Sequence, residues 1–358
     1  MSPLFVPGPV DIHPDVLDAL SKPMMYHRGI EFEKLYHKLE KEARPLLGTD
    51  RHVYISSFSG TGAMELAMRS LVKKDVLICD SGGFADRWVE IAQLNGKSPD
   101  LLKVENGQPI LPADILPFIK KKKYEAIAIV HNETSTGVEN PIAEIAAMIH
   151  QQSPDTLIFL DCVSSIGGTE ILFDDWGIDY AFGSINKCLA IPPGLALSVA
   201  SERALEKAKS VENRGWFMDI LRMEKHHFKN TVPSTPAVSL FYALEVQLER
   251  ITKEGLYNRF MRHQTMAERI AEWGEQNKMP PIAPKEYRSK TMTTVKNGHN
   301  LDFADLRAYL HQYDLEIANG YNELKDKTFR IANMGELQIA DVENLLTILE
   351  QYINQRKQ

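Results

Sequence analysis

Short apolar segments recur along the sequence, and a stretch with helical periodicity separates each from the next. The segments are HVYIS (52–56), VLIC (76–79), EAIAIV (125–130), TLIFLD (156–161) and LALSVA (195–200). Short and nearly continuous apolar runs are typical of strands that helices cover on both faces. The helical stretches between them are 61–72, 84–94, 112–121 and 142–151. This alternation predicts an α/β domain built on a mostly parallel sheet.

The pattern changes near residue 239, where a long helical stretch begins that is interrupted at 253–255. Strand-like segments follow at 291–295 and 328–332, with helical patterns at 302–312 and 339–353. A chain of 358 residues is also long for a single core. We therefore expect an N-terminal segment (1–20), a large domain (21–250) and a smaller C-terminal α+β domain (251–358).

The charge balance and the cysteine content exclude several classes of protein. The 41 basic and 48 acidic residues give a net charge of −7, which repels nucleic acids and anionic lipids. Three cysteines without a pairing pattern argue against a disulfide framework and favour a reducing compartment. The sequence shows no metal-binding motif, no secretory leader pattern and no membrane span. We expect a cytoplasmic protein with neither nucleic-acid nor membrane partners and no metal.

The turn after the first apolar segment has the residues of a phosphate site. It reads SGTGAME, in which glycines allow close backbone approach and Ser59 and Thr61 add hydroxyls at a helix N-terminus. The turn lacks the third glycine of a dinucleotide fingerprint and the lysine of a P-loop. This disfavours a nicotinamide dinucleotide or a nucleoside triphosphate. A tight turn with an N-cap is the alternative interpretation.

Polar residues also follow the segments at 125–130 and 156–161. In HNETSTG, Thr134 is the best-placed donor for a ligand, whereas His131 and Glu133 are candidates for bonding to the loop's own backbone. Asp161 ends the next segment, and a carboxylate buried there requires a cationic or N–H partner. A capping role in the following loop, supported by the serines at 164 and 165, is the alternative.

Lys187 follows the next expected strand, DYAFGS (179–184), at the same edge of the sheet. A single lysine is usually exposed and without chemical function. At this edge, however, a phosphate site, a carboxylate for a pyridinium nitrogen, a hydroxyl for a ring substituent and an amine for a Schiff base together match one ligand. That ligand is pyridoxal 5'-phosphate (PLP). The sequence therefore predicts a PLP site with Lys187 and Asp161 as catalytic residues.

Nearly the whole chain resembles the class V aminotransferases, which are PLP enzymes of fold type I. The likeness is greatest to the branch with alanine–glyoxylate, serine–pyruvate and 2-aminoethylphosphonate transaminases. It is carried by PGPVDIHPDVL, HRGIEF, SGTGAME, HNETSTGVENPI, DCVSSIGG, NKC and FRIANMGE. INKCL, ENPI and FRIANMGE look like the phosphonate transaminases, and HRGIEF looks like the glyoxylate branch.

The resemblance implies roles for matching positions. Lys187 would form the Schiff base and move the proton, and Asp161 would keep the ring nitrogen protonated. The implied cofactor-binding residues are Ser59, Gly60, Thr61, Phe84, Thr134, Asp161, Val163, Asn186, Lys187 and Thr231. Of these, Thr231 would reach the phosphate of a neighbouring subunit, which implies a homodimer with shared active sites.

The substrate side of the site follows from the same resemblance. Arg330 would pair with the substrate carboxylate through its planar fork. Gly8, in the N-terminal segment, and Arg28 are further candidates for substrate contact. The sequence departs from the glyoxylate enzymes at Asn186, where they usually have glutamine, and at Phe84, where they have tryptophan or tyrosine. Phe228 stands where some of them have a tyrosine that contacts the cofactor.

The sequence thus predicts an aminotransferase that moves an amino group from a small amino acid, of alanine or serine type, to a 2-oxo acid such as glyoxylate or pyruvate. Ping-pong kinetics would follow. 2-Aminoethylphosphonate–pyruvate transaminase and phosphoserine aminotransferase are alternatives, and an active-site Arg28 would favour such doubly anionic substrates. A desulfurase needs a cysteine late in the chain, but none follows Cys188. A dehydrogenase or sugar-nucleotide enzyme on a Rossmann-like sheet and an inactive interaction protein are more distant alternatives.

Overall fold

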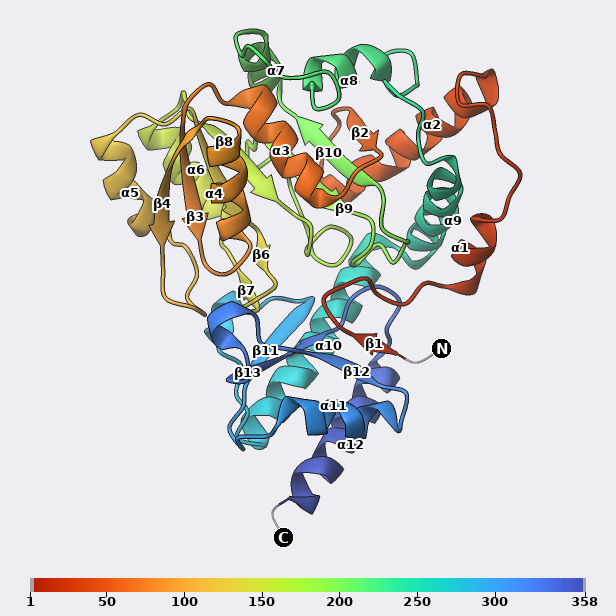
Figure 1. The fold of residues 1–358 in the computed structure, drawn as a ribbon, viewed down its shortest axis with the longest axis vertical. Helices are drawn as coiled ribbons and strands as arrows, with labels where there is room; N and C mark the ends of the chain where they lie inside the picture. The colour runs from red at the N-terminus through yellow and green to blue at the C-terminus, as the bar shows by residue number, and fades with distance from the viewer. Residues whose placement is uncertain (1–2, 357–358) are drawn as a thin grey trace.

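A seven-stranded sheet forms the centre of the larger part of the molecule (Figure 1). The computed structural model describes residues 3–356. In spatial order, the strands are β2 (Val53–Ser56), β10 (Ala196–Ala200), β9 (Tyr180–Ser184), β8 (Leu157–Asp161), β5 (Ala126–Val130), β3 (Asp75–Asp80) and β4 (Ser98–Lys103). All neighbours pair in parallel except β10, which is antiparallel to both β2 and β9. The carboxyl ends of β2, β3, β5, β8 and β9 therefore meet at one edge of the sheet.

Helices cover both faces of this sheet, as the continuous apolar strands require. In β5, Ile127 and Ile129 belong to one apolar cluster, and Ala126, Ala128 and Val130 belong to the other. The first cluster includes α1 (Pro14–Ala19), α2 (Ile30–Ala43), η1 (Arg44–Leu47), α5 (Pro112–Lys121), α6 (Ile142–Gln152) and α9 (Val238–Glu254). The second includes α3 (Gly60–Leu71), α4 (Ala85–Leu94), α7 (Glu202–Lys209) and α8 (Ile220–His227). The predicted mostly parallel α/β sheet is confirmed.

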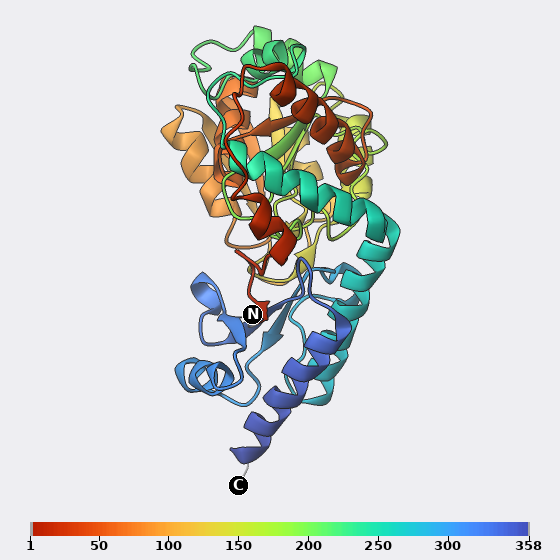
Figure 2. The same ribbon diagram turned by 90° about the vertical axis from the view of Figure 1, so that its right-hand side faces the viewer.

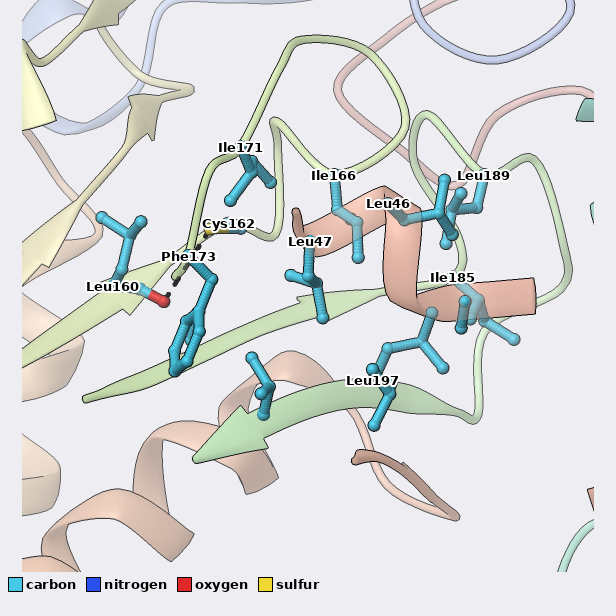
Figure 3. Packing of buried hydrophobic residues seen from close by; sticks show 14 of the residues in the cluster. Leu46, Leu47, Leu160, Cys162, Ile166, Ile171, Phe173, Ile185, Leu189 and Leu197 are labelled. Atoms are coloured by element: carbon cyan, nitrogen blue, oxygen red, sulfur yellow. Dashed lines mark hydrogen bonds between the residues drawn. The ribbon is translucent and has the colours of Figure 1, made fainter. Parts of the chain in front are cut away.

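Part of the first cluster holds the loops that follow β8 and β9. Figure 3 shows Ile166, from the loop after β8, and Ile185 and Leu189, from the loop after β9, gathered beside Leu46 and Leu47 of η1. All five side chains are nearly inaccessible to solvent. Because the apolar side chains of these loops are buried against η1, the polar residues that the loops carry at the sheet edge have little freedom to move.

A second, four-stranded sheet has its own apolar cluster. In spatial order, its strands are β1 (Leu4–Phe5), β12 (Glu316–Asn319), β13 (Thr328–Ala332) and β11 (Met292–Lys296). The helices and short 3-10 turns around it are α10 (Leu256–Gln276), η2 (Lys285–Tyr287), α11 (Phe303–His311), η3 (Asn322–Leu324) and α12 (Ile339–Gln355). Figure 2 shows α10 extending from the larger part of the molecule into the smaller one, alongside α12. This is the α+β arrangement that the change of pattern near residue 239 predicts.

Several elements were not anticipated from the sequence. Strand β1 comes from the N-terminus yet pairs in parallel with β12 of the smaller sheet. A short hairpin of β6 (Asn132–Glu133) and β7 (Val138–Glu139) projects from the end of β5. Within residues 3–356, no helix has the length and apolar character needed to cross a bilayer. The same residues contain no cluster of histidine, cysteine or acidic side chains suited to a metal ion.

Candidate active site

A cavity of about 280 Å³ opens at the edge where the carboxyl ends of the parallel strands meet. The predicted site residues that line it are Gly8, Ser59, Gly60, Thr61, Phe84, Thr134, Asp161, Val163, Asn186 and Lys187. They come from the N-terminal segment and from the loops after β2, β3, β5, β8 and β9. The cavity therefore lies where open α/β sheets bind ligands.

Lys187 is buried in the loop after β9, with only 7% of its surface exposed. Its Nζ donates to Ser164 Oγ at 2.7 Å and to Thr134 Oγ1 at 3.4 Å. Burial lowers the pKa of this amine to about 8, although attraction to Asp161 opposes that shift. A substantial fraction of the amine is therefore unprotonated just above neutral pH and available as a nucleophile or base.

Asp161 is the last residue of β8 and is 3% exposed. Its Oδ1 accepts the Val163 N–H at 2.9 Å. Burial raises the pKa of this carboxyl to about 6, while the Val163 N–H, Lys187 and Arg87 favour the ionised form. The carboxylate thus lies in the cavity as an acceptor suited to a cationic N–H group.

The start of α3 lines the cavity and is suited to an anion. Ser59 is the N-cap residue, but its side chain makes no capping hydrogen bond. The unpaired N–H groups of a first helical turn favour negative charge. A Cβ atom at Gly60 would lie 2.5 Å from Val163 Cγ2, so any larger residue at this position would require Val163 to shift. Thr61 Oγ1 accepts a hydrogen bond from Arg87 Nη1 at 3.2 Å.

Phe84 forms one wall of the cavity at the start of α4. Its ring stacks on Tyr321 with centroids 5.7 Å apart and an interplanar angle of 11°. Lys187 Nζ lies 5.2 Å from the centre of the Phe84 ring. The N-terminal segment closes the cavity near Lys187, since a Cβ atom at Gly8 would come within 3.0 Å of Lys187 Cγ. An aromatic wall beside the amine is suited to a flat ligand ring.

Three predicted residues do not line this cavity. Arg330 lies on β13, where its Nε donates to the Asn319 carbonyl at 2.8 Å and its guanidinium carbon is 5.5 Å from the Tyr321 ring centre. Its charge lowers the pKa of Lys187, so it lies within electrostatic range of the amine. Arg28 is exposed on the segment before α2, and Thr231 follows α8 with Oγ1 unpaired within the described chain. The structure does not bring these last two residues to the cavity of their own chain.

Sequence reasoning gave no ligand role to Ser164, Arg87 and Asn132, which line the cavity. Ser164, which the sequence suggests as a loop cap, instead accepts from Lys187 and bonds with Thr134 Oγ1 at 2.8 Å. Arg87 is the third residue of α4, an unfavourable position for a cation, and that position is a signal visible in the sequence. No sequence signal separates Asn132 from the other polar residues of its loop.

His131 and Glu133 bond to protein groups, but only Glu133 bonds to the backbone of its own loop, as one interpretation of the sequence suggests. His131 Nδ1 lies 3.0 Å from Ser165 Oγ. Glu133 accepts hydrogen bonds from the N–H and hydroxyl groups of Ser135 and from the Phe84 N–H. Both side chains therefore serve to hold the loops that shape the cavity.

The side chains around the cavity fit PLP. A nucleophilic amine, a buried carboxylate, a helix N-terminus with hydroxyls and an aromatic wall correspond to its aldehyde, ring nitrogen, phosphate and ring face. The buried Asn132 Oδ1 also has no hydrogen-bond partner within residues 3–356, as expected of an atom beside a ligand. The cavity of about 280 Å³ lies near the lower limit for small-molecule sites.

Comparison with known proteins gives a consistent result. The family model for class V aminotransferases matches residues 15–331. An L-aspartate–glyoxylate aminotransferase of Paracoccus denitrificans is 31% identical over 94% of this chain and 87% of its own length. A serine–glyoxylate aminotransferase of Methylorubrum extorquens is 31% identical over 93% of this chain and 86% of its own. The crystal structure of an alanine–glyoxylate aminotransferase of Nostoc sp. superposes with a TM-score of 0.92 at 29% identity, covering 98% and 94% of the two chains.

The chain therefore belongs to the class V aminotransferase family. Its fold is that of the fold-type I PLP enzymes, with the large, mostly parallel sheet described above. It is a PLP-dependent aminotransferase, as the sequence predicts.

Proposed function

We propose that the protein moves an amino group from a small amino acid, of alanine or serine type, to glyoxylate or pyruvate, in two half-reactions at one site. The observation that carries this proposal is the buried Lys187 amine, whose pKa is lowered, held by two hydroxyls in the cavity that contains Asp161. The names of the glyoxylate-dependent relatives support glyoxylate as an acceptor.

Lys187 and Asp161 have different roles in the proposed reaction. Bound PLP supplies an electron sink for the charge that develops at the substrate's α-carbon. Lys187 Nζ would remove the proton from the substrate's α-carbon and return it to the carbon on the other side of the amino nitrogen, and the Ser164 and Thr134 hydroxyls keep Nζ in position. Asp161 holds a proton at the pyridine nitrogen.

Binding and orientation come from the walls of the cavity. The first turn of α3 would hold the phosphate, and Phe84 would pack on the ring and exclude water. Arg330 binds the substrate carboxylate with the two terminal nitrogens of its guanidinium, because Nε already bonds to the Asn319 carbonyl. This fixed fork sets the direction from which an amino acid approaches Lys187.

We also propose a homodimer with shared active sites, in which Thr231 of one subunit reaches the phosphate of the other. Large apolar side chains at Met24, Tyr26, Ile30, Trp216, Phe217 and Phe228 are exposed in the single chain and support such a contact. We propose a segment (1–20) that contributes to the active site, a large domain (21–250) and a smaller domain (251–358), with the second boundary near the end of α9. The cytoplasm is the compartment that we propose, and three buried free thiols support it.

The central test follows the visible absorbance of the purified protein. The natural chain is expected to carry the absorbance of a lysine-bound cofactor, and L-alanine or L-serine should discharge it until glyoxylate or pyruvate restores it. Lys187→Ala should lose both the absorbance and the turnover, whereas Lys209→Ala, at an exposed lysine of α7, should retain them. 2-Aminoethylphosphonate and phosphoserine serve as competing donors. If none of these amines changes the absorbance, the proposed transfer is wrong.

A further inference from the structure

Arg87 is an arginine at the cavity whose charge the protein does not neutralise. Its side chain is half-buried and lines the cavity, with Nη1 3.2 Å from Thr61 Oγ1. The guanidinium carbon lies 5.5 Å from the centre of the Phe84 ring. Within residues 3–356, no carboxylate oxygen of an aspartate or glutamate lies within 4 Å of Arg87, in contrast to most arginines of the chain. The charge is therefore available to a ligand.

The place of Arg87 in its helix strengthens this conclusion. Helix α4 starts at Ala85, so Arg87 lies in the first turn, where the helix dipole disfavours a cation. The nearby Glu133 carboxylate accepts the Phe84 N–H at 3.3 Å and makes no ion pair with Arg87. The first turn of α3, which carries Thr61, also faces the cavity. Asp86 and the Glu133 carboxylate supply negative charge at the start of α4, whereas the first turn of α3 and the Arg87 guanidinium face the cavity together and favour a bound anion there.

We propose that Arg87 binds the phosphate group of PLP and is the side-chain cation of that subsite. The phosphate carries about −1.5 to −2 charges at neutral pH. Arg87 and Lys187 are the lysine and arginine side chains among the described residues that line the cavity, and the reaction needs the amine of Lys187. The planar guanidinium matches phosphate oxygens in a two-pronged contact, and its bond to Thr61 aims it at the turn that holds them.

A second consequence concerns Asp161. The positive charge of Arg87 favours the ionised form of that carboxyl and opposes the effect of burial. Arg87 therefore supports the acceptor for the ring nitrogen as well as the phosphate. A purely structural role, in which Arg87 only packs on Phe84, would affect neither group selectively.

The test distinguishes an effect of Arg87 on binding of the cofactor's phosphate from an effect on binding of its ring. Full-length protein freed of cofactor is titrated with PLP and, separately, with pyridoxal, which lacks the phosphate. Arg87→Gln should raise the dissociation constant of PLP by about 10-fold to 100-fold, the usual loss for a hydrogen-bonded charge pair. The constant for pyridoxal should rise much less, because pyridoxal has no phosphate and is affected only through the influence of Arg87 on Asp161. Arg87→Lys should recover part of the PLP affinity because it keeps the charge.

Arg356→Gln is the matched control, since it also removes an arginine that packs on an aromatic ring, at the distant end of α12. It should leave both constants unchanged. The assignment would be overturned if Arg87→Gln weakened the affinity for PLP and pyridoxal equally, or if it left the affinity for PLP unchanged. If Arg87→Gln does not fold, the ratio of the two constants in Arg87→Lys decides in the same way. Failure of the natural protein to bind PLP would instead contradict the family-level function.

Discussion

Burial of the Lys187 amine has a measurable cost in stability before any cofactor binds. Its pKa is about 8 in the folded chain, against an ordinary value of 10.5. This difference corresponds to about 3 kcal/mol of destabilisation by the charged amine at pH values below 8. Lys187→Met replaces the ammonium with an apolar chain of similar length. The Ser164 and Thr134 hydroxyls bond to each other at 2.8 Å, so the substitution leaves neither one unpaired.

The sign of the pH dependence follows from which state holds the proton. Between pH 8 and 10.5 the unfolded chain still binds the lysine proton that the folded chain has released, so folding stability rises with pH across this window. Below pH 8 both states are charged and the full penalty applies. Lys187→Met should therefore be more stable than the natural chain at pH 7, by up to about 3 kcal/mol, and the difference should shrink toward zero near pH 10.5.

Loss of the attraction between Lys187 and Asp161 reduces the gain, which makes about 3 kcal/mol its upper end. The measurement is the free energy of urea unfolding of both cofactor-free proteins between pH 7 and 10, at equal protein concentration because association would also stabilise them. Titrating groups that do not interact with Lys187 behave alike in the two chains and cancel in the comparison. A difference that stays constant with pH, or a natural chain that is more stable at pH 7, would refute the reasoning.

Two further predictions concern the walls of the cavity. Arg330→Gln should lower kcat/KM for amino-acid donors by about 10-fold to 100-fold but leave an amine that lacks a carboxylate little affected, in steady-state assays of both donors; equal losses for the two donors would count against carboxylate binding. Gly60→Ala places a Cβ atom 2.5 Å from Val163 Cγ2 and should cost about 1–3 kcal/mol in urea unfolding. The double variant with Val163→Ala should recover most of that stability. If the losses of unfolding free energy in the two single variants simply add in the double variant, the predicted clash between the two side chains is wrong.

The central sheet was predictable because its strands are buried on both faces and need continuous apolar runs. Strand β5 has this pattern over its whole length and divides its side chains between two apolar clusters. Strand β4 was not predicted because it lies at the edge of the sheet. Its residues, SPDLLK, are partly polar and partly exposed, so they do not form a continuous apolar run. Strand β1 has two residues, and its partner β12 lies more than 300 positions away along the chain. Local patterns carry no information on such a pairing.

The same contrast applies to the site. The places of Lys187 and Asp161 follow from topology alone, because Asp161 ends one parallel strand of the sheet and Lys187 lies in the loop that follows the neighbouring parallel strand. The contacts of Ser164 and Arg87 depend on the direction in which a loop or a helical turn points its side chains, which the order of strands does not determine. For Arg87 the sequence still contains an electrostatic signal, a cation in a first helical turn, and only the fold shows that this turn lies beside the first turn of α3 at the cavity. An unfavourable local charge is therefore informative once the sheet edge is known, since a bound anion would make its position favourable.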